Sequence, residues 1–254
     1  MSDAKPLLQV IDLTLTAGDK TLVRDLNWSV EPGQRWCLIG KNGAGKSSLI
    51  KLIGGIAEPI NMHGIIQWRG QDLATIEPDD FAKIRSYSEQ FVQGAFGMRA
   101  IDLLEAVCPH ETEKVEEYLN LFELQDLRQA WWRHLSGGEK QRFALAAALA
   151  QDASCWLMDE PLAHLDLHYQ VQILSLLAKQ SQSQQKAWIA AVHEVSLLRH
   201  AFTHALIFMP EQTYLAGPIE DVLKPEYLEA ALGQKMLEAQ LPDGSSYLVP
   251  ALGA

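Results

Sequence analysis

The sequence predicts an α/β fold built around a largely parallel sheet. Three short apolar runs, 155–158, 188–192 and 205–209, are each flanked by helical or loop sequence, which is the pattern of buried parallel strands. A fourth apolar run, 35–39, leads directly into a glycine-rich loop and then into apolar residues at helical spacing. Because no internal repeat is present, we expect one core, interrupted by a helical segment from about 97 to 150.

The other elements follow from local patterns. Residues 7–15 alternate loosely between apolar and polar side chains, which favours a strand, and 17–20 has the composition of a turn. Residues 139–151 are rich in strong helix formers, whereas 179–186, rich in Gln and Ser, is typical of a surface loop or a frayed helix end. One apolar helix face is formed by Val115, Tyr118, Leu119 and Phe122.

Composition excludes several classes of protein. Of the 254 residues, 48% are hydrophobic and 21% charged, so the chain is neither disordered nor a small disulfide scaffold. A formal net charge of −11 repels phosphodiester, so we expect no nucleic-acid partner, although a local phosphate cradle stays compatible with it. The three cysteines form no CxxC pair, and Cys37 and Cys155 are expected in the core. We recognise no secretory signal or membrane span and expect a cytoplasmic chain.

The loop after the 35–39 strand fits the pattern GxxxxGK[ST] of a phosphate-binding loop. Glycines allow successive N–H groups to point inward around phosphates, and the following helix presents its N-terminus to the anion. Lys46 would add a positive charge, and the Ser47 hydroxyl is a hard oxygen ligand for Mg²⁺. A chance glycine turn is the alternative, but the preceding strand favours nucleotide binding. The candidate nucleotide-binding residues are Gly40, Lys41, Asn42, Gly43, Ala44, Gly45, Lys46, Ser47 and Ser48.

Two carboxylates end the 155–158 strand. Asp159 and Glu160 are adjacent, so they point to opposite sides and serve different purposes. We expect one of them to hold Mg²⁺ and the other to reach the water that attacks the γ-phosphate. An acidic helix N-cap is the alternative, which the phosphate loop disfavours.

The segment 135–141, Leu-Ser-Gly-Gly-Glu-Lys-Gln, allows two compatible interpretations. Ser136 and Glu139 have the spacing of a capping box that opens a helix. Gly137 and Gly138 indicate in addition an anion site, because each glycine costs about 1 kcal/mol of helix propensity and a cap does not require them.

Together, the phosphate loop, the Leu-Ser-Gly-Gly-Glu segment and the sequence Leu-Met-Asp-Glu-Pro ending at Pro161 resemble the ATP-binding subunit of ABC transporters over nearly the whole chain. The resemblance implies an α/β P-loop NTPase core with a mixed, largely parallel sheet, an N-terminal antiparallel β-subdomain and an inserted α-helical subdomain. It implies an ATP-binding core over 1–90 and 146–222, a helical subdomain over 91–145 and a C-terminal tail over 223–254.

The resemblance also implies roles for single residues. Gln90 resembles the glutamine that touches Mg²⁺ and joins the core to the helical subdomain, so it is expected as a metal ligand with Ser47 and Asp159. Asp166 lies in a segment that resembles the D-loop, and His193 resembles the switch histidine near the γ-phosphate. Taken alone, a histidine there is more often a satisfied strand-end residue. Catalysis is thereby assigned to Glu160 and His193, with ATP and Mg²⁺ as cofactors.

In this family the Leu-Ser-Gly-Gly-Glu segment of one subunit closes over the phosphate loop of another, so the resemblance implies a homodimer that sandwiches ATP. Ser136 and Gly138 of the partner would clamp the γ-phosphate, and hydrolysis would reopen the pair. Two positions depart from the family: Ala17 replaces the aromatic residue that often stacks on adenine, and Ala163 replaces a frequent Ser or Thr.

Residues 215–223 resemble the end of the subfamily that serves iron–siderophore, haem and cobalamin import. This implies a peripheral subunit at the cytoplasmic face of the plasma membrane, integral-membrane permease partners and an extracytoplasmic substrate-binding protein. A membrane coupling helix would then dock near Phe91, Phe96, Met98 and Ile101, although a partly covered core loop is an equal alternative.

The rival function is a soluble ABC ATPase of an assembly machine, such as iron–sulfur cluster assembly. A ribosome-associated factor is disfavoured by the single cassette and the acidic charge. A small-molecule kinase is disfavoured because the Leu-Ser-Gly-Gly-Glu segment would then have no purpose.

Overall fold

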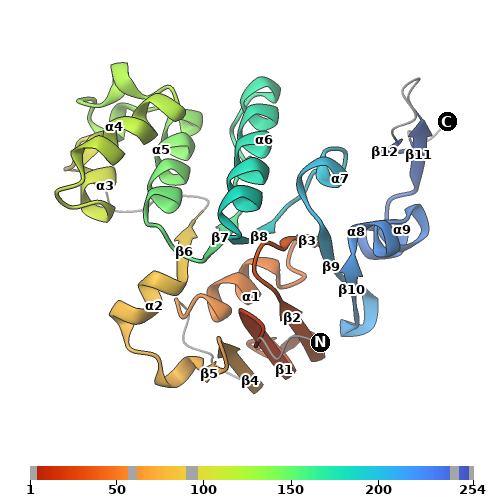
Figure 1. The fold of residues 1–254 in the computed structure, drawn as a ribbon. Helices are drawn as coiled ribbons and strands as arrows, with labels where there is room; N and C mark the ends of the chain where they lie inside the picture. Colours follow the sequence, from red (N-terminus) through yellow and green to blue (C-terminus); the bar gives the residue numbers. More distant parts are fainter. Residues whose placement is uncertain (1–4, 57–61, 90–96, 241–245, 252–254) are drawn as a thin grey trace.

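A computed structural model describes residues 5–56, 62–89, 97–240 and 246–251 of the chain (Figure 1). Its strands are β1 (Leu8–Ala17), β2 (Lys20–Val30), β3 (Arg35–Ile39), β4 (Met62–Trp68), β5 (Gln71–Asp72), β6 (Arg85–Ser88), β7 (Cys155–Asp159), β8 (Ala187–Ala191), β9 (His204–Phe208), β10 (Tyr214–Pro218), β11 (Met236–Gln240) and β12 (Ser246–Pro250). Its α-helices are α1 (Lys46–Ile53), α2 (Pro78–Ile84), α3 (Ala100–Val107), α4 (Thr112–Leu121), α5 (Gly137–Ala150), α6 (Leu167–Gln184), α7 (Leu198–Ala201), α8 (Ile219–Val222) and α9 (Pro225–Leu232). Single 3₁₀ turns are η1 (Leu73–Thr75), η2 (Gln125–Leu127), η3 (Trp132–His134) and η4 (Pro210–Gln212).

The larger sheet has the strand order β10-β9-β3-β8-β7-β6. Strands β9, β3, β8, β7 and β6 run parallel, and β10 is antiparallel to β9. Every residue of β7 and β8 is buried, because both faces of the sheet are covered. The predicted mixed, largely parallel sheet is confirmed, and the three predicted apolar strands are placed within one residue of their observed bounds.

The predicted N-terminal antiparallel β-subdomain is also confirmed. Strands β2, β1, β4 and β5 form this second sheet in that order. Its inner face packs with α1 against the larger sheet in one hydrophobic cluster that includes Leu8, Leu49 and Leu157. The Trp68 ring nitrogen donates to the Ile53 carbonyl at 2.9 Å, which fixes the end of α1 to this sheet.

The helical segment is inserted between β6 and β7 and covers the other face of the larger sheet. In Figure 1, α3 and α4 lie at one side of the molecule, and α5 extends from them to the core. Val115, Tyr118, Leu119 and Phe122 are buried in a second hydrophobic cluster, as their spacing predicts. The expected division between residues 145 and 146 falls inside α5, a single uninterrupted helix.

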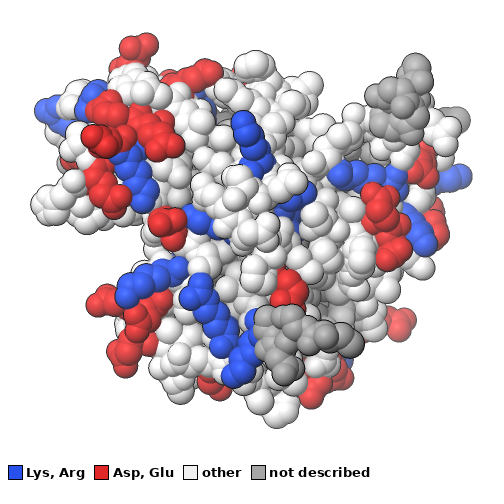
Figure 2. Space-filling view, viewed as in Figure 1, with Lys and Arg blue, Asp and Glu red and all other residues white. Residues whose placement is uncertain are grey.

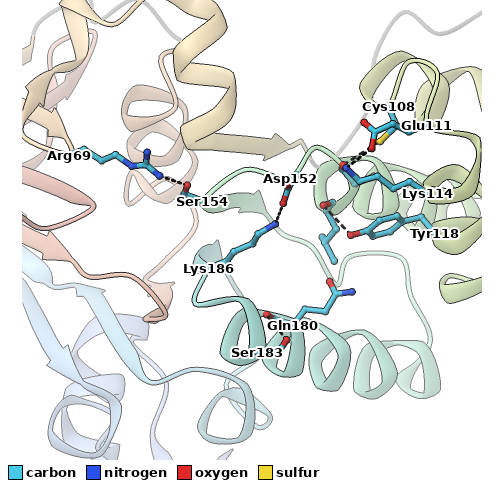
Figure 3. A network of polar contacts seen from close by, with 12 residues as sticks. Arg69, Cys108, Glu111, Lys114, Tyr118, Asp152, Ser154, Gln180, Ser183 and Lys186 are labelled. Carbon is cyan, nitrogen blue, oxygen red and sulfur yellow. Dashed lines mark hydrogen bonds and ion pairs between the residues drawn. The ribbon is translucent and has the colours of Figure 1, made fainter.

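Polar contacts connect the helical segment to the core at the edge where β7 and β8 begin, here called the starting edge (Figure 3). Lys186 Nζ lies 2.6 Å from Asp152 Oδ1, and Arg69 Nη2 donates to Ser154 Oγ at 2.5 Å. The Tyr118 hydroxyl of α4 donates to a backbone carbonyl near the end of α5 at 3.3 Å, which joins two helices of the segment to each other. The contacts of Asp152, Ser154 and Lys186 hold the residues that directly precede β7 and β8.

Three further expectations concern the surface and the core. The 179–186 segment is a helix end, because α6 continues through Gln184 and stops where Gln185 adopts a left-handed φ of 54°. Cys37 and Cys155 are fully buried, and burial raises the pKa of both thiols. Basic and acidic side chains are interspersed on the face shown in Figure 2. Within the described ranges, no helix has both the length and the apolar character that a membrane span requires.

Candidate functional site

The phosphate loop connects the end of β3 to the first residue of α1. Gly43 and Gly45 have φ values of 73° and 110°, which side chains with a Cβ rarely adopt. A Cβ on Gly45 would also lie 2.9 Å from the Leu22 Cβ. The glycine spacing is therefore required both by the backbone turn and by the close approach of β2.

Lys46 lies inside the loop as its sequence position predicts. Its side chain is 5% exposed, and Nζ donates to the Gly40 carbonyl at 2.8 Å and to the Lys41 carbonyl at 3.2 Å. Burial lowers the Lys46 pKa, while the negative charges of Glu160 and Asp159 act in the opposite direction. The ammonium is thus held in place by carbonyls before any anion binds.

Asp159 and Ser47 meet across the beginning of α1. The Ser47 hydroxyl donates to Asp159 Oδ1 at 2.8 Å. Asp159 is 6% exposed, and burial raises its pKa, partly opposed by this hydrogen bond. A serine hydroxyl beside a buried carboxylate is a set of hard oxygen donors that suits Mg²⁺.

Glu160 and His193 meet at the edge where β7 and β8 end, here called the ending edge. Glu160 follows β7 with a left-handed φ of 52°, and its N–H donates to the Ala191 carbonyl of β8 at 3.1 Å. His193 Nε2 lies 2.6 Å from Glu160 Oε1. The backbone after β7 directs Glu160 towards the loop after β8, which carries His193, whereas the preceding residue, Asp159, contacts Ser47.

A cavity of about 540 Å³ brings these groups together. Its lining comprises Asn42, Gly43, Ala44, Gly45, Lys46, Ser47, Ser48, Glu160 and His193. Segment 135–139, the signature segment from here on, does not contribute to this lining. Asp166 caps α6, because its Oδ1 accepts from the Tyr169 N–H at 3.0 Å, and Gln90 lies outside the described residues.

The signature segment begins α5 with the predicted capping box. Ser136 Oγ accepts from the Glu139 N–H at 3.3 Å, and the Ser136 N–H donates to Glu139 Oε2 at 2.7 Å. The Ser136 hydroxyl also donates to Glu139 Oε2 at 2.8 Å, and the two hydrogen bonds that this carboxylate accepts lower the Glu139 pKa. A Cβ on Gly138 would lie 2.9 Å from the His164 carbonyl oxygen, and one on Gly137 would lie 3.3 Å from the His164 Cβ. The glycines therefore also permit this close packing with His164, which no local pattern in the sequence indicates.

Comparisons with known proteins identify the family of the chain. A model of the ABC transporter family matches residues 23–163, more than half of the chain. An uncharacterized ABC transporter ATP-binding protein of Haemophilus influenzae is 34% identical, in an alignment 198 positions long that covers 74% of either chain. The hemin import ATP-binding protein HmuV of Methylobacillus flagellatus is 28% identical, in an alignment 260 positions long that covers 96% of either chain.

A solved ABC transporter assigned to the metal-chelate type, in an inward-facing conformation, has the same fold. It superposes with a TM-score of 0.82 over 98% of both chains at 24% identity. The phosphate loop and its two carboxylates lie inside the part of the sequence that the family model matches. The chain belongs to the ABC transporter family, as an ATP-binding subunit with ATPase activity.

Proposed function

We propose that this ATPase subunit works as a homodimer that powers uptake of a metal chelate of the haem or siderophore class through membrane permease partners. The dimer is supported by the lining of the ATP pocket, to which the signature segment of the same chain does not contribute. Glu160 and His193 line that pocket. A second copy supplies the signature segment.

Within the pocket, each residue has a distinct part in hydrolysis. Loop N–H groups and Lys46 bind the β- and γ-phosphates. Glu160 orients or deprotonates the attacking water, and His193, hydrogen-bonded to it, contacts the γ-phosphate side. The partner's signature segment then covers the γ-phosphate, where the N-terminus of its α5 faces the anion.

Mg²⁺ fits the oxygen donors at the beginning of α1. Ser47 and Asp159 would hold it, with Gln90 as a third ligand, and it would neutralise charge on the β- and γ-phosphates. Burial raises the Asp159 pKa, which reflects a desolvation cost to the carboxylate that a bound cation would offset.

Disulfide trapping between two differently tagged chains tests the dimer. One chain carries Ala44→Cys in the phosphate loop and the other Ser136→Cys, and the three native cysteines are buried. We expect a cross-linked heterodimer that forms with ATP and not without it. A control pair, Ala44→Cys with Ser183→Cys at the far end of α6, should remain uncrosslinked. Equal cross-linking of the two pairs would refute the sandwich.

Support for import comes from the relatives named above, one of which is called a hemin import protein, and from residues 215–223. We propose a peripheral location under the permease, which would link this subunit indirectly to an extracytoplasmic substrate-binding protein. The docking segment would include Met98, which is partly buried, whereas Ile101 is 5% exposed and lies in the hydrophobic core; Phe91 and Phe96 lie outside the described residues. We also propose the division into a core of 1–90 and 146–222, a helical subdomain of 91–145 and a tail of 223–254.

Affinity purification of the tagged chain from detergent-solubilised native membranes tests this part. We expect a polytopic membrane protein at one-to-one stoichiometry, identified by mass spectrometry. Purification of soluble partners alone would refute import and favour an assembly machine.

A further inference from the structure

The C-terminal hairpin β11–β12 and the helix α7 are two short elements that need external support. An isolated two-stranded hairpin is marginal in water, and α7 has only four residues, too few for a helix to persist alone. Both lie on the side of the molecule away from α3 and α4 in Figure 1. The loop that contains His193 connects β8 to α7. Contacts that fix the position of α7 therefore also fix the end of this loop that joins α7.

Arg199 of α7 supplies the central polar contact. Its Nη1 lies 2.6 Å from Glu238 Oε1 of β11 and also donates to Ser246 Oγ of β12. Its Nη2 donates to the Leu223 carbonyl at 2.9 Å. Ser246 Oγ in turn donates to Glu238 Oε1 at 2.7 Å, which closes a triangle of hydrogen bonds. The Arg199 side chain is 18% exposed and the Glu238 side chain 41%, so the arginine is the more buried partner of these charge-assisted bonds.

Neighbouring side chains reinforce the same junction. The His200 ring stacks on Tyr247 with 5.1 Å between centroids, and the Tyr247 hydroxyl lies 3.3 Å from His200 Nε2. Met236 and Leu248 of the hairpin are buried in the same hydrophobic cluster as Leu198 of α7. The hairpin is therefore anchored to α7 by an ion pair, a ring stack and apolar burial together.

We propose that Arg199 is a positioning residue for ATP hydrolysis: through its contacts with the hairpin it fixes α7, and with it the loop that holds His193 against Glu160. This inference rests on the role of His193 in the proposed function. It assigns the C-terminal hairpin a purpose as a support of α7 and, through α7, of the loop between β8 and α7.

Arg199→Ala in the full 254-residue chain tests the proposal. We expect kcat for ATP hydrolysis to fall about ten-fold, because a misplaced catalytic group loses rate steeply with distance, while Kd for ATP changes less than about two-fold. Hydrogen exchange of amides 192–198 should accelerate, and exchange in the phosphate loop should stay unchanged. Arg199→Lys should recover part of the rate, since an ammonium can reach Glu238 but cannot bridge all three acceptors.

Two further variants separate positioning from damage to the fold. Glu238→Gln, which removes only the charged acceptor, should show a smaller change in the same direction and provides the readout if Arg199→Ala does not fold. Arg69→Ala, which breaks an arginine contact at the starting edge, should leave kcat and the 192–198 exchange at wild-type values.

The outcomes distinguish this inference from the proposed function. If His193→Ala abolishes hydrolysis while Arg199→Ala and Glu238→Gln leave kcat unchanged, only the positioning role is refuted. If His193→Ala hydrolyses at the wild-type rate, the catalytic role of His193 and the positioning role fall together. A parallel loss of ATP affinity and rate in Arg199→Ala would also overturn positioning, because it would indicate general damage.

Discussion

The two edges of the larger sheet use polar side chains in opposite ways. At the starting edge, Lys186 pairs with Asp152 and Arg69 with Ser154, so these groups find their partners within the chain (Figure 3). At the ending edge, Glu160 and His193 border an open cavity beside the phosphate loop. The same sheet therefore has one edge where an ion pair and a hydrogen bond join parts of the chain, and one edge where the paired Glu160 and His193 face a cavity.

The difference follows from the direction of parallel strands. Their carboxyl ends meet the N-terminus of α1, where backbone N–H groups attract an anion, and the crossover loops leave space outside the sheet. Their amino ends meet the ends of α5 and α6, where side chains fill the space and fix the helical segment. Changes at the ending edge should therefore alter chemistry, whereas changes at the starting edge should alter only stability.

The largest expected effect is that of Glu160→Gln. Loss of the carboxylate base should lower steady-state ATP hydrolysis about 100-fold or more, while ATP binding persists because the loop and Lys46 are intact. Size-exclusion chromatography with light scattering should then show a stable dimer with MgATP and a monomer without it. Hydrolysis at the wild-type rate would contradict the catalytic role of Glu160.

Lys46→Ala should act on binding itself. Removing a charge-assisted contact to phosphate costs about 2 kcal/mol, which is roughly a thirty-fold rise in Kd for ATP, measured by titration calorimetry. Lys51→Ala, on the same helix and paired with Glu89, is the matched control and should bind ATP normally. Equal affinity for the two variants would place the phosphates elsewhere.

Gly138→Ala should separate the two halves of the ATP sandwich. The new Cβ would lie 2.9 Å from the His164 carbonyl oxygen and force the signature segment to shift, while the phosphate loop of the same chain stays intact. In the Glu160→Gln background we expect unchanged ATP affinity of the monomer but no ATP-dependent dimer. Gly217→Ala, whose Cβ meets only an ordinary contact at 3.5 Å, is the control and should dimerise.

The smallest effect is expected at the starting edge. Asp152→Asn removes the ion pair with Lys186 and should lower the free energy of unfolding by about 0.5 kcal/mol at pH 7, because the carboxylate is mostly exposed. Asparagine tolerates the left-handed φ of 55° at this position, so the backbone should be retained. ATPase activity should match the wild type.

The contribution of the Lys186–Asp152 ion pair to stability depends on pH in a defined direction. The Lys186 hydrogen bond lowers the Asp152 pKa, so its stabilisation is complete above the unfolded carboxyl pKa near 3.9 and is lost as pH falls through the folded value. Urea unfolding of wild type and Asp152→Asn should therefore differ at pH 7, and the difference should shrink as the pH falls below the unfolded carboxyl pKa. A difference that persists in acid would assign it to something other than the ion pair.

Sequence patterns predicted most of the fold because its strands are buried on both faces and its loops carry strong local signals. The runs ending at Met158 and Val192 contain almost nothing but apolar residues, so periodicity and flanking sequence were sufficient. Strands β4, β5 and β10 and the C-terminal hairpin were not predicted, because short strands with mixed burial depend on their neighbours for pairing.

For the site, the sequence by itself determined which residues carry chemistry. Glycine spacing, a lysine and two carboxylates in order specify a phosphate loop and its acidic strand, because those residue types have few other uses in that arrangement. Tertiary structure alone decided which of them meet. The turn after β7 directs Asp159 to Ser47 and Glu160 to His193, and the packing of His164 explains the two glycines of α5. The role of Arg199 could likewise not be predicted from the sequence, because nothing in the neighbouring sequence distinguishes it from other arginines. Its partners, Glu238 and Ser246, come close to it only when the C-terminal tail folds over α7.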